Sequence, residues 1–251
     1  MFIRSTAGSQ ALERGLQLLR SFRPGTALLT NAELAERVGL PRPTVSRLTR
    51  SLVDAGFLVY DVKRRGYRLG AVSLSLASAY RSSEPVLDLV LPHMRALAEG
   101  RRVNVGLAVA DQLEMVYLDS ARFSRLGLFR RLVPGSRIPI AQTALGCAYL
   151  AGMQPGSREE LIDRLVSENG SAWPAIKVQM TKALEDIDRR GYCYAYWAAG
   201  MGAVATPLIA PDGGVYSLNV SFPVREDTSD SELHDHAQLL LELKQRLMSE
   251  L

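Results

Sequence analysis

The sequence predicts an α+β protein with a small, basic, mostly helical N-terminal module and a larger C-terminal domain that mixes helices with antiparallel strands. Positive charge is concentrated at the start of the chain. Residues 1–80 hold 12 lysines and arginines against 5 acidic residues, whereas residues 81–251 hold 18 against 21. The hydrophobic spacing is helical near the N-terminus and then alternates between helical and β-rich runs. We therefore expect three parts, with boundaries at 1–70, 71–85 and 86–251.

Two helices are expected at the start of the basic module. The stretch "SQALERGLQLLRSF" (9–22) has apolar residues at helical spacing. The predicted core side of this helix contains Leu12, Leu16 and Leu19. The stretch "TNAELAERVGL" (30–40) opens with Thr30 and carries Glu33 three residues later, which is the spacing of a capping box. A second helix should therefore begin at Thr30 and end near Gly39.

A third helix is expected within "GLPRPTVSRLTRSLVDAGFL" (39–58). Proline lacks a backbone N–H and suits the first helical position, so Pro43 should begin the helix and Arg42 should precede it. One side of this helix is apolar, with Val45, Leu48 and Leu52. The other side presents Pro43, Ser46, Arg47 and Arg50. Because only a few residues separate the second helix from the third, the pair has the layout of a helix-turn-helix.

A β-hairpin with a basic tip should follow the third helix. The stretch "FLVYDVKRRGYRLG" (57–70) contains two short β-prone runs around a charged turn. An arginine-rich helix beside a basic hairpin has the electrostatic character of a phosphate-backbone binder, although each feature alone could be solvated surface. The module is thus predicted to bind duplex DNA, with one arginine of the helix reading a guanine edge. The predicted interface comprises Arg42, Pro43, Thr44, Ser46, Arg47, Arg50, Lys63, Arg64 and Arg65.

A linker helix is expected in "AVSLSLASAYRSSEP" (71–85), where Val72, Leu76 and Tyr80 are at helical spacing. No apolar run is long enough for a transmembrane helix, and residues 1–10 lack the apolar stretch of a signal peptide, so we expect a cytoplasmic protein without membrane contact. The two cysteines, Cys147 and Cys193, are too few for a disulfide framework or a metal cluster. They are interpreted as reduced buried thiols, and neither a metal nor another cofactor is expected.

The C-terminal domain should alternate helices with hairpin-joined strands. The expected elements are a helix (86–100), two strands (103–110 and 113–121), an extended run (126–133), a helix capped by Thr143, two helices (157–170 and 175–191), three strands (192–197, 203–210 and 215–223) and a closing amphipathic helix (230–251).

The chain as a whole resembles the IclR (isocitrate lyase regulator) family of bacterial transcription factors. The N-terminal likeness lies in "ERGLQLL", "ELAERVGLPRPTVSRLTRSLVDAGFL" and "YRLG", and the C-terminal likeness in "PIAQTALGCAYLA", "GYCYAYWAAGMGAVATP" and "YSLNVSFP". The resemblance implies DNA binding as a homodimer or a dimer of dimers, and a GAF-like sheet that cups a small organic ligand. The family's pocket positions would fall on Ile138, Ala144, Leu145, Ala203, Asn219 and Ser221. The sequence departs from the family at Cys147, usually Lys or Arg, and at Ala198 and Ala199, in a commonly acidic stretch.

The residues themselves also point to an anion site in this domain. Thr143 is a good N-cap, and the free N–H groups near Ala144 and Leu145 would carry the positive end of a helix dipole. We expect a small organic acid there, an aromatic acid being one option, with small residues at Ala144 and Gly146 leaving room for it. Further walls are expected from Asn219 and Ser221 on one face of a strand, and from Tyr194 and Tyr196. Three plainer interpretations stay open: Thr143 only caps its helix, the polar strand face meets water, and the tyrosines belong to the core.

Two other classes of function fit the sequence less well. An enzyme is disfavoured because His234 and His236 would diverge by about 200° on a helix and could not chelate a metal together. The "GMG" at 200–202 also lacks the spacing of a phosphate loop, and no nucleophile has an evident base partner. The third possibility is a DNA-binding regulator without a ligand, whose C-terminal domain serves only oligomerisation.

Overall fold

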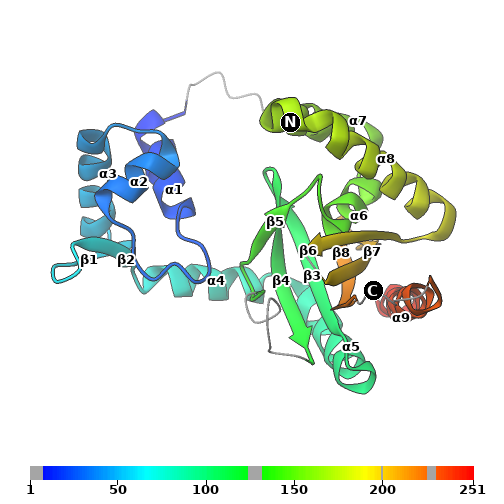
Figure 1. The fold of residues 1–251 in the computed structure, drawn as a ribbon. Helices are drawn as coiled ribbons and strands as arrows, with labels where there is room; N and C mark the ends of the chain where they lie inside the picture. The colour runs from blue at the N-terminus through cyan, green and yellow to red at the C-terminus, as the bar shows by residue number, and fades with distance from the viewer. Residues whose placement is uncertain (1–7, 124–131, 199, 225–229) are drawn as a thin grey trace. The chain divides into compact units, whose positions relative to one another are not determined.

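The computed structural model describes residues 8–123, 132–198, 200–224 and 230–251. The chain forms two compact units, of which the first ends at Glu84 and the second begins at Pro85 (Figure 1). The extended run expected at 126–133 lies outside the described residues except for its last two. The side chains of residues 196–198 and 230 also lie outside them.

The first unit is a winged helix-turn-helix. Its elements are α1 (Gln10–Arg20), α2 (Asn31–Val38), α3 (Arg42–Asp54), β1 (Leu58–Asp61), β2 (Gly66–Leu69) and α4 (Val72–Ser82). The first three helices pack around a small common core. The strands β1 and β2 pair in antiparallel fashion. The core residues are Leu18, Leu29, Leu34, Ala35, Val45 and Leu48. The linker helix is confirmed as α4 and is grouped with this unit.

The predicted helix ends are largely confirmed. Thr30 and Glu33 form a reciprocal capping box at the start of α2, and Gly39 ends that helix with a left-handed φ of +65°. The third helix begins one residue earlier than predicted, at Arg42, with Pro41 as its N-cap. The first-turn N–H groups have no partner within a helix, so a proline is accommodated at the second helical position as well as at the first.

The predicted core side of α1 is wrong. Leu18 is fully buried, whereas Leu12 is 62% exposed and Leu16 is 50% exposed. Helical spacing identifies residues that share a side of the helix, but the side that meets α3 depends on tertiary packing. The helix α4 likewise contains no buried residue, and its Leu76 is 55% exposed. Both helices therefore carry apolar side chains that this unit does not bury.

The second unit contains a six-stranded sheet in which every neighbouring pair is antiparallel. The strand order is β5-β4-β3-β8-β7-β6. The strands are β3 (Asn104–Asp111), β4 (Glu114–Arg122), β5 (Arg137–Pro139), β6 (Cys193–Ala198), β7 (Met201–Ile209) and β8 (Val215–Pro223). The two predicted hairpins, β3–β4 and β7–β8, are confirmed.

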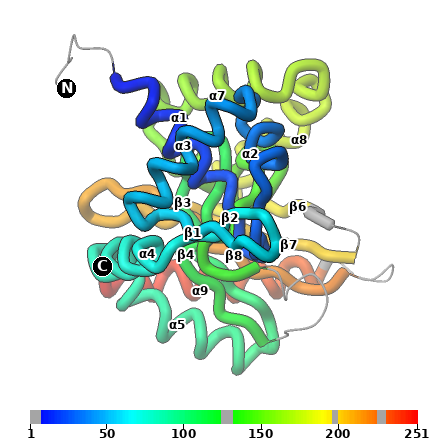
Figure 2. Tube along the Cα trace, turned by 90° about the vertical axis from the view of Figure 1, so that its left-hand side faces the viewer, coloured from blue at the N-terminus to red at the C-terminus, as the bar shows by residue number. Residues whose placement is uncertain are grey.

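Helices cover both faces of this sheet (Figure 1, Figure 2). The helices α5 (Pro85–Arg101) and α9 (Asp230–Glu250) lie side by side against one face. On the other face α6 (Ala144–Gly152) packs against the sheet, and α8 (Trp173–Arg190) packs against α6 and β6. α7 (Pro155–Asn169) adds Leu161 and Leu165 to the core on this side and is joined to α8 by a short 3₁₀ turn (Gly170–Ala172). Each face has its own hydrophobic core, so β7, β8 and most of β3 are buried on both sides.

The alternation predicted for β8 is confirmed, but its polar face does not meet water. Leu218, Val220 and Phe222 join the core under α5 and α9. Ser217, Asn219 and Ser221 alternate with them and are 0%, 3% and 3% exposed, respectively. Since α6 packs against this face of β7 and β8, the three polar side chains are covered by a helix. Buried polar groups need hydrogen-bond partners, which makes this face a candidate for a ligand site.

Candidate DNA interface and ligand pocket

The exposed side of α3 carries the residues that the sequence assigned to DNA contact. Arg42, Pro43, Ser46, Arg47 and Arg50 are exposed, and Thr44 is half-buried. The opposite side packs into the core through Val45, Leu48 and the partly buried Leu52, as predicted. The exposed arginines therefore project from a helix whose orientation is fixed by its buried side.

Contacts between α2 and α3 hold part of this surface in place. The Nδ2 of Asn31 donates a hydrogen bond of 3.0 Å to the Oγ of Ser46. Arg50 lies 3.7 Å from Asp54 at side-chain exposures of 82% and 67%, so this ion pair is worth little and leaves the guanidinium available. Sequence reasoning missed Asn31, because only the crossing of the two helices brings it to Ser46.

The hairpin presents its basic tip beside α3. Lys63, Arg64 and Arg65 are all exposed. The Oδ1 of Asp61 accepts a hydrogen bond of 2.9 Å from the backbone N–H of Arg64, and Arg65 has a φ of +51°. The turn is thus shaped by Asp61, while the three cationic side chains extend into solvent.

A groove of about 350 Å³ lies between α3 and the β1–β2 hairpin, which is the wing of this unit. Its walls come from Ser46 and Arg50 on α3 and from Tyr60, Arg65 and Tyr67 on the hairpin. The rings of Tyr60 and Tyr67 lie 5.1 Å apart, across a directly paired position of the two strands. The structure therefore brings the two predicted basic segments to one surface and adds a tyrosine pair, which the paired register of a hairpin could have indicated.

A pocket of about 100 Å³ lies at the N-terminus of α6. We call it the α6 pocket. Six residues that the sequence assigned to a ligand line it, namely Ile138, Thr143, Ala144, Leu145, Ala203 and Asn219. Tyr117, Leu132 and Pro139 complete the wall. Residues far apart in the sequence therefore converge on one small cavity.

Thr143 is the N-cap of α6, as predicted. Its Oγ1 accepts a hydrogen bond of 3.2 Å from the N–H of Gly146 and donates one of 2.7 Å to the carbonyl oxygen of Pro139. The N–H groups of Ala144 and Leu145 precede Gly146 in the same first turn, at the wall of the pocket. The expectation that Gly146 leaves room for a ligand is wrong, because a Cβ there would collide with the backbone of Ile140.

Asn219 brings an unsatisfied acceptor to the pocket. Its Nδ2 donates a hydrogen bond of 2.7 Å to the Oγ of Ser221, whereas its Oδ1 is buried and has no partner among the described residues. Burial raises the pKa of the neighbouring Tyr117 phenol, and a hydrogen bond donated by the Asn219 amide group acts in the opposite direction. A Cβ at Gly106 would meet both Asn219 and Tyr117, so glycine makes room for the two side chains.

Three of the predicted ligand residues are not in the α6 pocket. Ser221 lines a smaller recess that shares Tyr117, Leu132 and Asn219 with the pocket. Tyr194 stacks at 6.4 Å on Phe222, whose side chain belongs to the core under α5 and α9. Tyr196 pairs with Gly202 in the sheet, and its side chain lies outside the described residues. The alternation along β6 explains why Tyr194 turns away, since its neighbours Cys193 and Ala195 belong to the other face.

Comparison with known families decides what these two units are. Residues 11–62 match the IclR helix-turn-helix domain, and residues 78–247 match the C-terminal domain of bacterial transcriptional regulators of the IclR type. The chain belongs to the IclR family. Its members among the matched proteins are transcriptional regulators and not enzymes.

Individual relatives agree with the IclR assignment. The HTH-type transcriptional regulator TsaQ1/TsaQ2 of Comamonas testosteroni is 33% identical over 76% of this chain and 68% of its own length. The crystal structure of an IclR-family regulator from Brucella abortus is 32% identical, with a TM-score of 0.86 over 100% of this chain and 96% of that one. An IclR homologue from Microbacterium hydrocarbonoxydans, solved in complex with 4-hydroxybenzoate, has the same fold at 22% identity and a TM-score of 0.70, over 96% and 100% of the two chains.

The IclR chain is thus a DNA-binding transcriptional regulator with a winged helix-turn-helix. Across the described ranges, no three histidine, cysteine or acidic side chains gather as a possible metal site. No helix in the part of the chain that the structure describes combines the length and apolar character of a membrane span.

Proposed function

We propose that a small organic acid, bound in the α6 pocket, modulates the affinity of this regulator for its operator. The observation that carries the proposal is the unsatisfied Oδ1 of Asn219, which is buried at the wall of the same pocket as the N-terminus of α6. A buried acceptor without a partner is unfavourable, and a ligand donor would relieve it. The first-turn N–H groups would receive the ligand's carboxylate.

The two ends of the pocket favour an acid that also carries a hydroxyl group. The carboxylate would lie at the N–H groups of Ala144 and Leu145, and the hydroxyl would donate to Asn219. The cavity of about 100 Å³ favours a small molecule. The homologue from Microbacterium hydrocarbonoxydans was crystallised with 4-hydroxybenzoate, which has both groups. An aromatic hydroxy acid is therefore the first class to test.

Duplex DNA is proposed to lie against the exposed side of α3 and the wing. The N-terminus of α3 would face a phosphate, and Arg47 or Arg50 would form a bidentate contact with a guanine. The wing residues Lys63, Arg64 and Arg65 would contact flanking phosphates. For a bacterial regulator of transcription, we propose a cytoplasmic location.

Assembly as a homodimer or a dimer of dimers is proposed from the apolar side chains that the first unit leaves uncovered. Leu16 on α1 and Leu74 on α4 are 50% and 72% exposed. A second copy would cover such groups and would also supply the second half-site contact of an operator. Light scattering should give at least a dimer at micromolar concentration, whereas a monomer with and without DNA would contradict the assembly.

The effector proposal is tested by titrating the full chain with 4-hydroxybenzoate and with benzoate in a calorimeter. The wild type should bind the hydroxy acid more tightly, by about fivefold to tenfold for one hydrogen bond to a buried acceptor. Asn219→Leu should bind both acids equally, because it removes the acceptor at similar side-chain volume. If no hydroxylated or plain acid binds the wild type, the ligand-free alternative holds, in which the C-terminal domain serves only oligomerisation.

A further inference from the structure

A second and larger cavity adjoins Thr143. It measures about 580 Å³ and is lined by residues 141–143, by α6 and α8, and by β6, one of the two edge strands of the sheet. We call it the α8 cleft. Thr143 lines both cavities, whereas Asn219 lines only the α6 pocket and Asp186 only the α8 cleft. The two sites are therefore neighbours with different chemistry.

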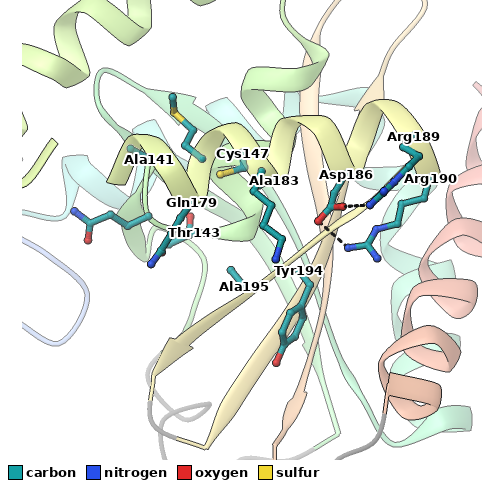
Figure 3. A pocket seen from close by; sticks show the side chains of 13 residues that line it. Ala141, Thr143, Cys147, Gln179, Ala183, Asp186, Arg189, Arg190, Tyr194 and Ala195 are labelled. Atoms are coloured by element: carbon teal, nitrogen blue, oxygen red, sulfur yellow. Dashed lines mark hydrogen bonds and ion pairs between the residues drawn. The ribbon is translucent and has the colours of Figure 1, made fainter. Parts of the chain in front are cut away.

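One end of the α8 cleft carries a fixed cationic group. The carboxylate of Asp186 is only 10% exposed and lies 2.7 Å from the Nη2 of Arg189 and 2.9 Å from the Nη2 of Arg190 (Figure 3). Arg190 also lies 4.4 Å over the ring of Tyr192 and donates from its Nε to the Tyr192 carbonyl oxygen. Two guanidinium groups thus face one carboxylate and keep further N–H groups for a ligand.

Lys182 adds a third cation one helical turn before Asp186. Its side chain lines the cleft and makes no hydrogen bond or ion pair with any other described residue, and the same is true of the Gln179 side chain. Among the residues that line the cleft, Lys182, Arg189 and Arg190 are cationic and Asp186 alone is anionic. The cleft therefore carries an excess of two positive charges.

Between its two ends the cleft has a floor of small side chains. Figure 3 shows Asp186, Arg189 and Arg190 at one end and Thr143 and Gln179 toward the other. Cys147, Ala183 and Ala195 lie between them. Burial raises the pKa of the Cys147 thiol to about 12, so this floor is uncharged at neutral pH. A carbon skeleton can lie along it without leaving a charge unpaired.

We propose that the α8 cleft is a second small-molecule site, which binds an organic dianion. The dianion is a dicarboxylate or a phosphate monoester whose two negative charges match the excess at Lys182, Arg189 and Arg190. The paired Asp186 acts as a positioning residue, because it holds both guanidinium groups at the cleft. The site is separate from the proposed effector pocket, and it does not depend on that pocket having a ligand.

The test is calorimetric titration of the full chain at low ionic strength, where charge interactions are least screened. The probes are adipate, the monoanion hexanoate of equal chain length, the neutral 1,6-hexanediol, and butyl phosphate. Adipate or butyl phosphate should bind about tenfold more tightly than hexanoate, and the diol should not bind. The stronger of the two dianions then identifies the head group. Equal binding of adipate and hexanoate, or no binding of either dianion, would overturn the proposal.

Variants place the binding in the cleft. Lys182→Gln and Arg189→Gln should each weaken the dianion by about threefold to tenfold. Lys177→Gln is the matched control, because Lys177 is an exposed lysine of the same helix that does not line the cleft. Ala144→Leu, which fills the α6 pocket, should leave dianion binding unchanged. If Lys177→Gln weakens binding as much as Lys182→Gln, or if only Ala144→Leu abolishes it, the assignment to the α8 cleft is wrong.

Discussion

The hydroxyl of Thr143 donates a hydrogen bond of 2.7 Å to the carbonyl oxygen of Pro139 and thereby joins the end of β5 to the start of α6. The same oxygen accepts the N–H of Gly146. One side chain therefore caps the helix and fixes the segment that forms one wall of the α6 pocket. This relationship makes Thr143 a residue whose structural and ligand roles can be separated by substitution.

We expect Thr143→Ala to lower the free energy of unfolding by about 1 kcal/mol, because it removes an N-cap. Thr143→Ser retains the hydroxyl and should lose much less. Urea unfolding followed by circular dichroism measures both. Equal loss in the two variants would show that the methyl group, and not the cap, supplies the stability.

The buried hydroxyl of Ser217 leads to a prediction of the opposite sign. Its Oγ is fully buried and has no partner within the described ranges. Removing an unsatisfied polar group relieves its desolvation penalty, so Ser217→Ala should leave the free energy of unfolding unchanged or raise it by up to about 1 kcal/mol. The same urea titration applies, and a loss of more than about 1 kcal/mol would reveal a hydrogen bond that the hydroxyl makes in solution.

Arg47→Ala should reduce sequence discrimination. The operator is first selected from random duplexes. If Arg47 contacts a guanine edge, Arg47→Ala should reduce the difference in binding free energy between the operator and scrambled DNA by about 1 to 3 kcal/mol. Fluorescence anisotropy with both duplexes measures this difference. Arg164→Ala is the control, an exposed arginine of α7. Unchanged discrimination in the Arg47 variant would remove this residue from the base contacts.

Arg64→Ala should weaken all DNA about equally. A phosphate contact carries no sequence information, so the affinities for the specific and the scrambled duplex should decrease by similar factors. The slope of the logarithm of the binding constant against the logarithm of the salt concentration should become about one unit less steep. Titrations at several salt concentrations give that slope. A loss confined to the specific duplex would instead place Arg64 at a base edge.

The thiols should be protonated in the folded protein. Burial raises the pKa of Cys147 to about 12 and raises the pKa of Cys193 as well. An unfolded thiol ionises near pH 8.5, whereas the buried thiols stay protonated. The free energy of unfolding is therefore unaffected by these thiols below pH 8.5 and decreases as the pH rises from there toward 12. Iodoacetamide at pH 8.5 should therefore alkylate the native protein much more slowly than the urea-unfolded protein. Equal rates would mean that the thiols are accessible in the fold.

Much of the fold could be predicted because its signals are local. The capping box at Thr30 and Glu33, the proline-headed third helix and the two hairpins of the sheet each depend on residues close in sequence. The buried side of α1 could not be predicted, since Leu16 and Leu18 are equally apolar and only packing against α3 selects Leu18.

The candidate sites could likewise be predicted only where their signals are local. The alternation in β8 predicts that Asn219 and Ser221 share a face, but only the position of α6 shows that the face is buried. Tyr194 lines the α8 cleft and not the α6 pocket, and alternation alone does not tell which side of β6 meets which cavity. The charged end of the α8 cleft has a local signal, since Arg189 and Arg190 follow Asp186 at helical spacing. The cleft itself had none, because its other walls come from residues 141–147 and from β6.

The proposed regulation requires that DNA affinity respond to an acid in the α6 pocket. The most direct test measures operator affinity by fluorescence anisotropy for the wild type and for Ala144→Leu, with increasing concentrations of an acid that binds the wild type. We expect the acid to change the operator affinity of the wild type, and Ala144→Leu to bind the operator normally without responding to the acid. An unchanged wild-type affinity, or an equal response in both proteins, would contradict it.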